Sequence, residues 1–121
     1  MTQYLGIVDV IWRGQVLPCE KGSKIRPGGI RNNVVTLSRS AGRAQEFQPS
    51  EVTAKVHLPA GASALALFDP GEGELQVICD TRQTFVIRDA FLSGDIPTIT
   101  GGAGGEIDLT WSGGAAEEIL A

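Results

Sequence analysis

The chain has 121 residues, of which 42% are hydrophobic and 20% charged, and its formal net charge is −4. This length corresponds to one domain, residues 1–121, that can bury a core of its own, and the hydrophobic content excludes a disordered chain. No apolar run approaches the roughly 20 residues of a membrane-spanning helix, so membrane insertion is not expected. The first residues lack the basic start of a secretory signal.

Two cysteines, Cys19 and Cys79, are too few for a disulfide scaffold. Both stand beside strand-like residues, which favours buried or half-buried free thiols. Charge is unevenly distributed, because residues 1–55 have a net charge of +4 and residues 56–121 a net charge of −8. Two interpretations remain open. The halves can mix in one fold, or the basic half of one subunit can contact the acidic half of the next, a contact that builds rings or filaments.

Sixteen glycines and six prolines divide the apolar segments into short pieces, a spacing typical of an all-β protein. Residues 4–12 are expected to form a strand that is apolar on both faces and therefore covered on both sides. Short strands are expected at 16–17 and 23–26. The sequence as a whole predicts a small antiparallel sandwich or barrel of about seven or eight strands with one short helix.

Residues 30–37 and 51–58 have the composition of two strands that pair with each other as a hairpin. In the second, apolar and polar residues alternate cleanly, which predicts one buried and one solvated face. The connection, residues 38–48, is polar and basic apart from Phe47, and is long for a compact domain. It is either a floppy surface loop tethered by Phe47 or an extended arm that reaches a neighbouring subunit.

Residues 59–70 predict the short helix, with Ser63 as its N-cap, placed over one end of the sandwich or barrel. A hairpin follows, with strands at 75–79 and 84–92. Residues 101–105 are expected to be a flexible glycine loop, and 106–111 alternate as a half-buried strand does. The tail, residues 114–121, is too short to form a helix alone, so any order in it must come from docking.

The sequence contains no pattern that indicates an enzyme or a cofactor site. His57 is the only histidine, so there is no metal-binding constellation. Ser63 lacks the second glycine of a nucleophile elbow, and the glycine loop lacks the residues and the helix of a phosphate site. Glu106 and Asp108 share a strand face, where a solvated acidic face is a simpler explanation than glycosidase carboxylates.

Segment 80–120 carries a resemblance to a known family. Its pieces RQTFVIRDAFLSG, PTITGG and GGEIDLTWSG, followed by AAEEIL, resemble the C-terminal half of the tail tube protein of Mu-like contractile-tailed bacteriophages. The resemblance implies a virion protein, assembled in the host cytoplasm, whose stacked hexameric rings form a channel for DNA ejection. It implies as partners other copies of the chain, the sheath, tape measure, baseplate and tail terminator proteins, and double-stranded DNA that passes without specific binding.

A tube subunit needs contacts between copies and a lumen that does not retain DNA. The residues expected at inter-subunit contacts are Arg31, Arg39, Arg43, Phe47, Asp89, Asp95, Glu106 and Asp108. Because each basic contact with phosphate adds affinity through counterion release, an acidic or polar lumen is expected. Its candidate lining is Glu51, Thr53 and Lys55, although Lys55 and His57, on the same strand face, argue against this assignment unless they are paired.

Three alternatives stay open. The chain can be the inner tube of a tailocin or another contractile injection device, a monomeric β-barrel binding module, or a small hydrolase. Sequence-specific DNA binding is disfavoured, because the chain is acidic overall. Trp12 and Trp111, which could stack on bases, also stand in apolar strand patterns that are typical of a core.

Overall fold

The structure is a computed structural model that describes residues 2–6, 8–17, 19–58, 61, 63–102 and 105–120. Within these residues it is all-β with one short helix, as predicted. In chain order the elements are β1 (Val8–Trp12), β2 (Gln15–Leu17), β3 (Lys24–Arg26), β4 (Gly29–Leu37), β5 (Ser40–Gln48), β6 (Ser50–His57), α1 (Ala64–Leu67), β7 (Gly73–Cys79), β8 (Gln83–Leu92), β9 (Ile99–Thr100), β10 (Glu106–Gly113) and β11 (Glu117–Leu120).

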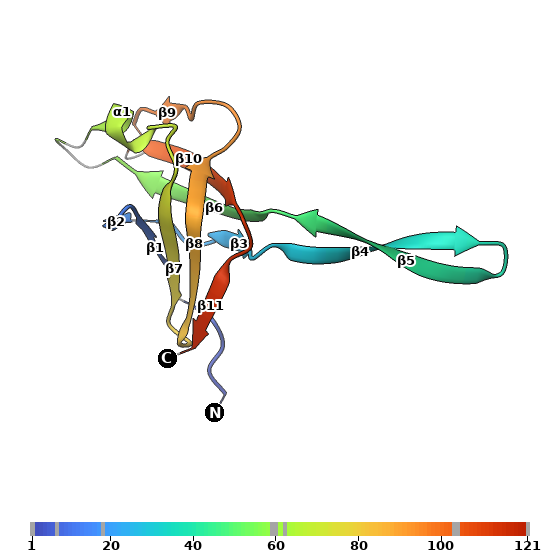
Figure 1. The fold of residues 1–121 in the computed structure, drawn as a ribbon. Helices are drawn as coiled ribbons and strands as arrows, with labels where there is room; N and C mark the ends of the chain where they lie inside the picture. The colour runs from blue at the N-terminus through green and yellow to red at the C-terminus, as the bar shows by residue number, and fades with distance from the viewer. Residues whose placement is uncertain are drawn as a thin grey trace.

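The body of the molecule is one folded antiparallel sheet with strand order β2–β1–β7–β8–β10–β6–β3. β8 joins its two halves, since its first part pairs with β7 while Phe91 and Leu92 pair with Ser112 and Trp111 of β10. Short strands extend both halves: β11 pairs with β8, and β9 with β10. The strands of the two halves cross and enclose the core between them (Figure 1).

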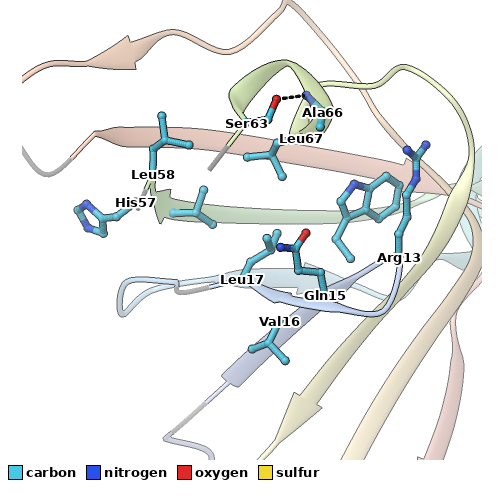
Figure 2. A pocket seen from close by; sticks show the side chains of 11 residues that line it. Arg13, Gln15, Val16, Leu17, His57, Leu58, Ser63, Ala66 and Leu67 are labelled. Atoms are coloured by element: carbon cyan, nitrogen blue, oxygen red, sulfur yellow. Dashed lines mark hydrogen bonds between the residues drawn. The ribbon is translucent and has the colours of Figure 1, made fainter. Parts of the chain in front are cut away.

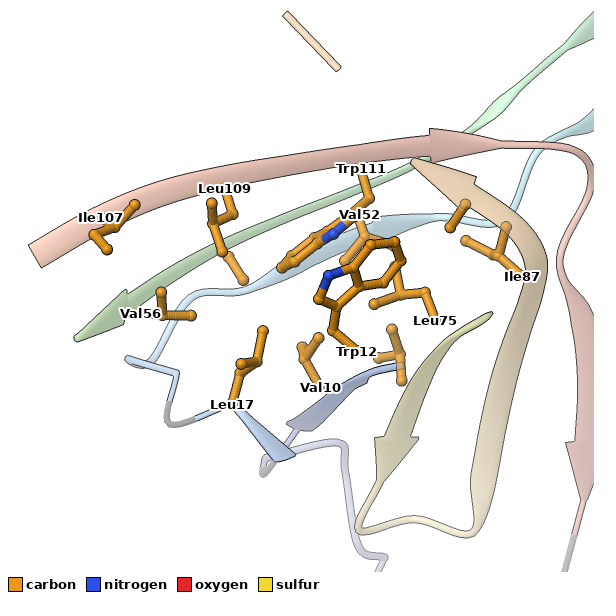
Figure 3. Packing of buried hydrophobic residues seen from close by; sticks show 13 residues of the cluster. Val10, Trp12, Leu17, Val52, Val56, Leu75, Ile87, Ile107, Leu109 and Trp111 are labelled. Carbon is orange, nitrogen blue, oxygen red and sulfur yellow. The ribbon is translucent and has the colours of Figure 1, made fainter. Parts of the chain in front are cut away.

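The core is built from alternating residues of these strands. In β6 every second residue is buried, among them Val52, Ala54 and Val56, while the residues between them face outward. Trp12 and Trp111 pack in its centre with ring centroids 5.8 Å apart (Figure 3), a geometry that contributes about 0.5–1.5 kcal/mol beyond burial. Both tryptophans are therefore core residues rather than stacking platforms for bases.

Several sequence expectations hold locally. Ser63 caps α1, because its Oγ accepts a hydrogen bond from the Ala66 backbone nitrogen at 3.2 Å. Both cysteines are free thiols, Cys79 buried and Cys19 half-buried. Of the expected helix segment, residues 59, 60 and 62 lie outside the described residues, as do residues 103 and 104 of the glycine loop and residue 121 of the tail.

Other expectations are corrected. The described part of the chain contains eleven strands rather than seven or eight, because short edge strands such as β9 and β11 add to the sheet. β1 is buried mainly on one face, since Asp9 is exposed and Ile11 only half-buried. The tail does acquire order by docking, and it does so on its own chain: residues 117–120 pair with residues 83–86 of β8.

The largest correction concerns residues 30–58. Residues 30–37 do not pair with 51–58 across a loop over 38–48. Instead β4 pairs along its whole length with β5, from Gly29 opposite Gln48 to Leu37 opposite Ser40. β6 pairs with β10 and β3. The reason is a two-residue turn at Ser38 and Arg39, where Ser38 has a positive φ of 46° as tight hairpin turns require.

Candidate assembly surfaces

A two-stranded arm, β4 and β5, leaves the body from the start of β6 and extends far from it (Figure 1). Its base is held by three contacts. Arg26 donates to the Pro49 carbonyl oxygen at 3.3 Å, its guanidinium lies 3.6 Å from Glu51, and the Ala116 nitrogen donates to the Pro27 carbonyl oxygen at 2.8 Å. The arm is thus a hairpin with an anchored base, which agrees with the expected extended arm and not with a floppy loop.

Both faces of the arm carry apolar side chains that none of the described residues covers. Directly paired residues share a face, so Ile30 and Phe47 lie together on one face with Val34, while Val35 and Leu37 lie on the other. Ile30 is 65% exposed, Val34 78%, Leu37 62% and Phe47 53%. A two-stranded hairpin is marginally stable alone, and exposed apolar strands favour contact with another chain.

The three arginines expected at inter-subunit contacts all lie on the arm. Arg31 is engaged within it: its guanidinium donates to Asn33 Oδ1 at 2.8 Å and lies 3.7 Å from Glu46, and the Asn33 amide donates to Glu46 at 2.8 Å. Arg39, in the turn, and Arg43, opposite Val34, are exposed. Within the described residues neither of these two has an ion pair, so the tip of the arm presents two unpaired cations.

The acidic residues expected to contact the arm of a neighbouring subunit lie in different parts of the molecule. Asp89 is occupied in its own chain, because it accepts a hydrogen bond from the Gly114 nitrogen at 3.0 Å and so orders the link from β10 to β11. Asp95 is exposed in the connection between β8 and β9. Glu106 and Asp108 lie on the outward face of β10 beside Lys55. The structure therefore gathers Glu106 and Asp108, but not Asp89 and Asp95, into one surface.

That surface, here called the polar face, is the outward side of β3, β6 and β10. The register places polar or charged side chains next to one another on the outward side of the three strands. It contains all three residues expected to line a lumen. Its members are Lys24, Arg26, Glu51, Thr53, Lys55, His57, Glu106, Asp108, Thr110 and Ser112.

Lys55 is paired on the polar face, which removes the objection to it as a lining residue. Its Nζ lies 2.8 Å from Glu106 and 4.0 Å from Asp108. The hydrogen bond and the charge of Glu106, followed by the charge of Asp108, raise the pKa of Lys55 above its ordinary value. His57 Nε2 lies 2.6 Å from Glu20. Three Lys or Arg residues face three Asp or Glu residues here, so the face is polar and nearly charge-balanced.

A cavity of about 340 Å³ opens at the other end of β6 from the arm (Figure 2). We call it the α1 pocket. Leu17 of β2, Leu58 after β6 and Leu67 of α1 line it. Arg13 closes one side, where it forms an ion pair of 3.1 Å with Asp69 and donates to the Gly71 carbonyl oxygen at 2.6 Å. A backbone hydrogen bond from Gly71 and then Arg13 hold the pKa of Asp69 below its ordinary value.

Metal-binding arrangements do not emerge from the part of the chain that is described. No group of three or more His, Cys, Asp or Glu side chains there is placed to hold a metal ion. Burial, and then the charge of Asp9, raises the pKa of Cys19; burial, and then Asp80, raises that of Cys79. Both thiols are therefore poor nucleophiles. Of the helices described, none is long and apolar enough to span a membrane.

Comparison with known proteins shows which family the sequence matches. The sequence model of the family described as phage tail tube protein matches residues 1–118. Among curated proteins, none matches the chain.

Solved structures with the same fold come from contractile assemblies. The anti-feeding prophage cap (AFP tube terminating cap) has a TM-score of 0.70 at 9% identity, over 100% of this chain and 95% of that one. The sheath/tube terminator of the extracellular contractile injection system PVC, in its extended state, has 0.66 at 9%, over 93% of each chain. A chain of the PVC sheath-tube complex in its extended state has 0.65 at 9%, over 94% of this chain and 88% of that one.

Proposed function

Since this chain belongs to the phage tail tube protein family, we propose that it is the repeating subunit of a tube built from stacked hexameric rings. The observation that carries the proposal is the arm. Its two apolar faces are exposed in one copy, and burial against neighbouring copies would stabilise both the arm and the ring. The arm projects sideways from the body (Figure 1), so copies related by rotation can each cover the next one's arm.

In this tube the polar face lines the lumen, including Glu51, Thr53 and Lys55. Its supporting feature is that it presents no apolar side chain and that Lys55 is neutralised by Glu106 and Asp108. A charge-balanced wall adds little salt-dependent affinity for phosphate, so double-stranded DNA can pass during ejection without being held. Glu106 and Asp108 then serve the lumen rather than the contact with a neighbour's arm.

The remaining predicted contacts belong to the exterior and to the ring interfaces. Arg39, Arg43 and Phe47 on the arm are proposed to contact the next subunit, with Asp95 as the exposed carboxylate available to them. Tail sheath, terminator, tape measure and baseplate proteins are the partners that such a tube requires in a phage virion, assembled in the host cytoplasm. Support for sheath and terminator comes from the fold shared with tube and terminator chains.

A second candidate is the inner tube of a protein-injecting contractile device. It is favoured by the three structural neighbours described above, which come from the anti-feeding prophage and from the extracellular contractile injection system PVC. The two candidates share the architecture and differ in cargo. A monomeric binding module would have no use for the exposed arm.

Electron microscopy of the purified protein tests the proposal directly. We expect rings with six-fold symmetry that stack into hollow tubes as the concentration rises, and mass measurements at low concentration should show the hexamer. A protein that remains strictly monomeric at high concentration and forms no rings would contradict the proposal. The salt dependence of DNA retention in preformed tubes tests the assignment of the lumen, and it should be near zero if the lumen is charge-balanced.

A further inference from the structure

The two ends of the barrel carry complementary features. β1 runs from Val8 to Trp12, and the α1 pocket lies at its Trp12 end. Segment 2–6 precedes β1 and therefore leaves from the opposite end, where the Gly6 nitrogen donates to Asp80 Oδ1 at 3.1 Å. Figure 1 shows α1 and the start of the chain at opposite ends of the body, with the arm pointing away from both.

Segment 2–6 presents large apolar side chains beyond its tether. Tyr4 is 82% exposed and Leu5 55% exposed. The end of β11, which pairs with the start of β8, also exposes Ile119 and Leu120. This end of the barrel is thus an apolar surface from which Tyr4 projects, and nothing in the described chain covers it.

The α1 pocket supplies an apolar wall that matches these side chains. Trp12, which is only 4% exposed, forms part of its wall, and its indole Nε1 has no hydrogen-bond partner among the described residues. In Figure 3 the five-membered ring of Trp12 lies toward Leu17 and Val56, two residues that also line the pocket. The indole nitrogen itself is closed off from solvent, so Trp12 offers a docking side chain apolar ring surface rather than this donor.

We propose that residues 2–5 of one copy dock in the α1 pocket of the next copy along the tube, with the Tyr4 side chain entering the pocket. The phenol ring then packs among Leu17, Leu58 and Leu67. Tyrosine suits this place, because it combines apolar area with a polar tip. The inference rests on the proposed tube and assigns the contact between its rings.

The lengths are compatible with this arrangement. β8 has 10 residues and spans roughly 33 Å, which sets the height of the body. Tyr4 is two residues from Gly6, so its backbone reaches about 7 Å from that tether when extended, and its side chain extends further. A copy displaced along the barrel by about its own height therefore brings Tyr4 within reach of the next pocket. The contact is head to tail and does not close on itself, so it propagates as a filament.

The test uses two variants. Tyr4→Ala removes the docking side chain, and Ala66→Phe fills the pocket. Gln3→Ala, in the same segment as Tyr4, is the control. We expect both test variants to form rings but to need about tenfold or more protein to form tubes, as for a lost hot-spot residue. Tyr4→Phe should have a smaller effect in the same direction. Tubes at the wild-type concentration from both test variants would overturn the inference while leaving the proposed function intact. Absence of rings and tubes from the wild type would overturn both.

Crosslinking identifies the occupant of the pocket. In a Cys19→Ser, Cys79→Ala background, cysteines introduced by Tyr4→Cys and Gln15→Cys should join copies into a ladder of multimers on oxidation. The control pair, Thr36→Cys with Gln15→Cys, should give none. A ladder from the control pair instead would show that the arm occupies the pocket. No ladder from either pair in assembled tubes would show that neither segment occupies it. Each of these results would contradict the proposal.

Discussion

Lys55 on β6 and Glu106 on β10 are joined by an ion pair of 2.8 Å, and this pair links the basic half of the chain to its acidic half within one subunit. Arg13 and Asp69 do the same at 3.1 Å. The uneven distribution of charge along the sequence is therefore partly resolved by folding. On the arm, Arg39 and Arg43 keep charges that no ion pair among the described residues neutralises.

The Lys55 pairing predicts a pH dependence at the alkaline side. A pKa raised by folding contributes stability that is present below the unfolded pKa of lysine, about 10.4, and is lost as pH rises through the folded pKa. Lys55→Gln should thus lower the melting temperature slightly at neutral pH and have no effect at a pH above the folded pKa. Thermal denaturation across this range checks it, with Lys24→Gln as the control; an equal effect of both substitutions would argue against the pairing.

Asp69 predicts the opposite dependence. Its pKa is lowered by folding, so its contribution is present above the unfolded value of about 3.9 and is lost as pH falls through the folded pKa. Asp69→Asn should destabilise the protein at neutral pH, and the difference from wild type should disappear in acid. Melting curves from neutral to strongly acidic pH measure this. Asp95→Asn, a change at an exposed residue, should have no effect at either pH.

The arm predicts a separation of folding from assembly. Replacing residues 31–46 by Asn-Gly leaves Ile30 and Phe47 directly opposite each other across a two-residue turn. The shortened protein should fold with a melting temperature close to wild type and should form no rings. Circular dichroism and sedimentation measure the two properties. Normal rings from the shortened protein would show that the arm is not an interface.

Point changes sharpen that test. Val34→Ser with Leu37→Ser removes apolar area from both faces of the arm, while Thr36→Ser changes a polar neighbour as a control. The double variant should weaken ring formation about tenfold or more, because the loss falls on the surfaces that a neighbour covers. Its monomer should be as stable as wild type, since both side chains are largely exposed.

The core supplies a prediction of stability. Trp111 is fully buried against Trp12, so Trp111→Ala should cost about 3–5 kcal/mol in the free energy of unfolding. Trp111→Phe, which keeps an aromatic ring, should cost less. Urea denaturation of the arm-shortened protein would measure both without interference from assembly. A cost below about 1 kcal/mol for Trp111→Ala would contradict the central place of this residue in the core.

Much of the fold was predictable because its signals are local. The alternation in β6 and β10, the turn before β8 and the cap at Ser63 depend on neighbours in sequence, and the structure shows each of them. Segment 80–120 also resembled the tail tube family, and the match over residues 1–118 confirms the family, while its Mu-like subgroup stays a prediction.

The pairing of β4 with β5 was missed although the sequence contains a signal for it. Ile30 pairs with Phe47 and Arg31 with Glu46, and both pairs are symmetric about Ser38 and Arg39. Without a glycine or asparagine at that point, the turn did not look like a tight hairpin. The pairing of Lys55 with Glu106 and the docking of β11 on β8 could not be predicted, because both depend on which distant strands become neighbours.

Pairing between β4 and β5 joins residues that are close in sequence, whereas the barrel requires β1 to find β7 and β6 to find β10. Local pairing is entropically cheap and fast, while distant pairing is slow. The arm can therefore form before the rest of the sheet is paired. A newly made chain then exposes the apolar side chains of the arm while its body is still incomplete. Premature association is the hazard of that order of events, and the charges of Arg31, Glu46, Arg39 and Arg43 along the hairpin oppose it by keeping the unassembled arm hydrated.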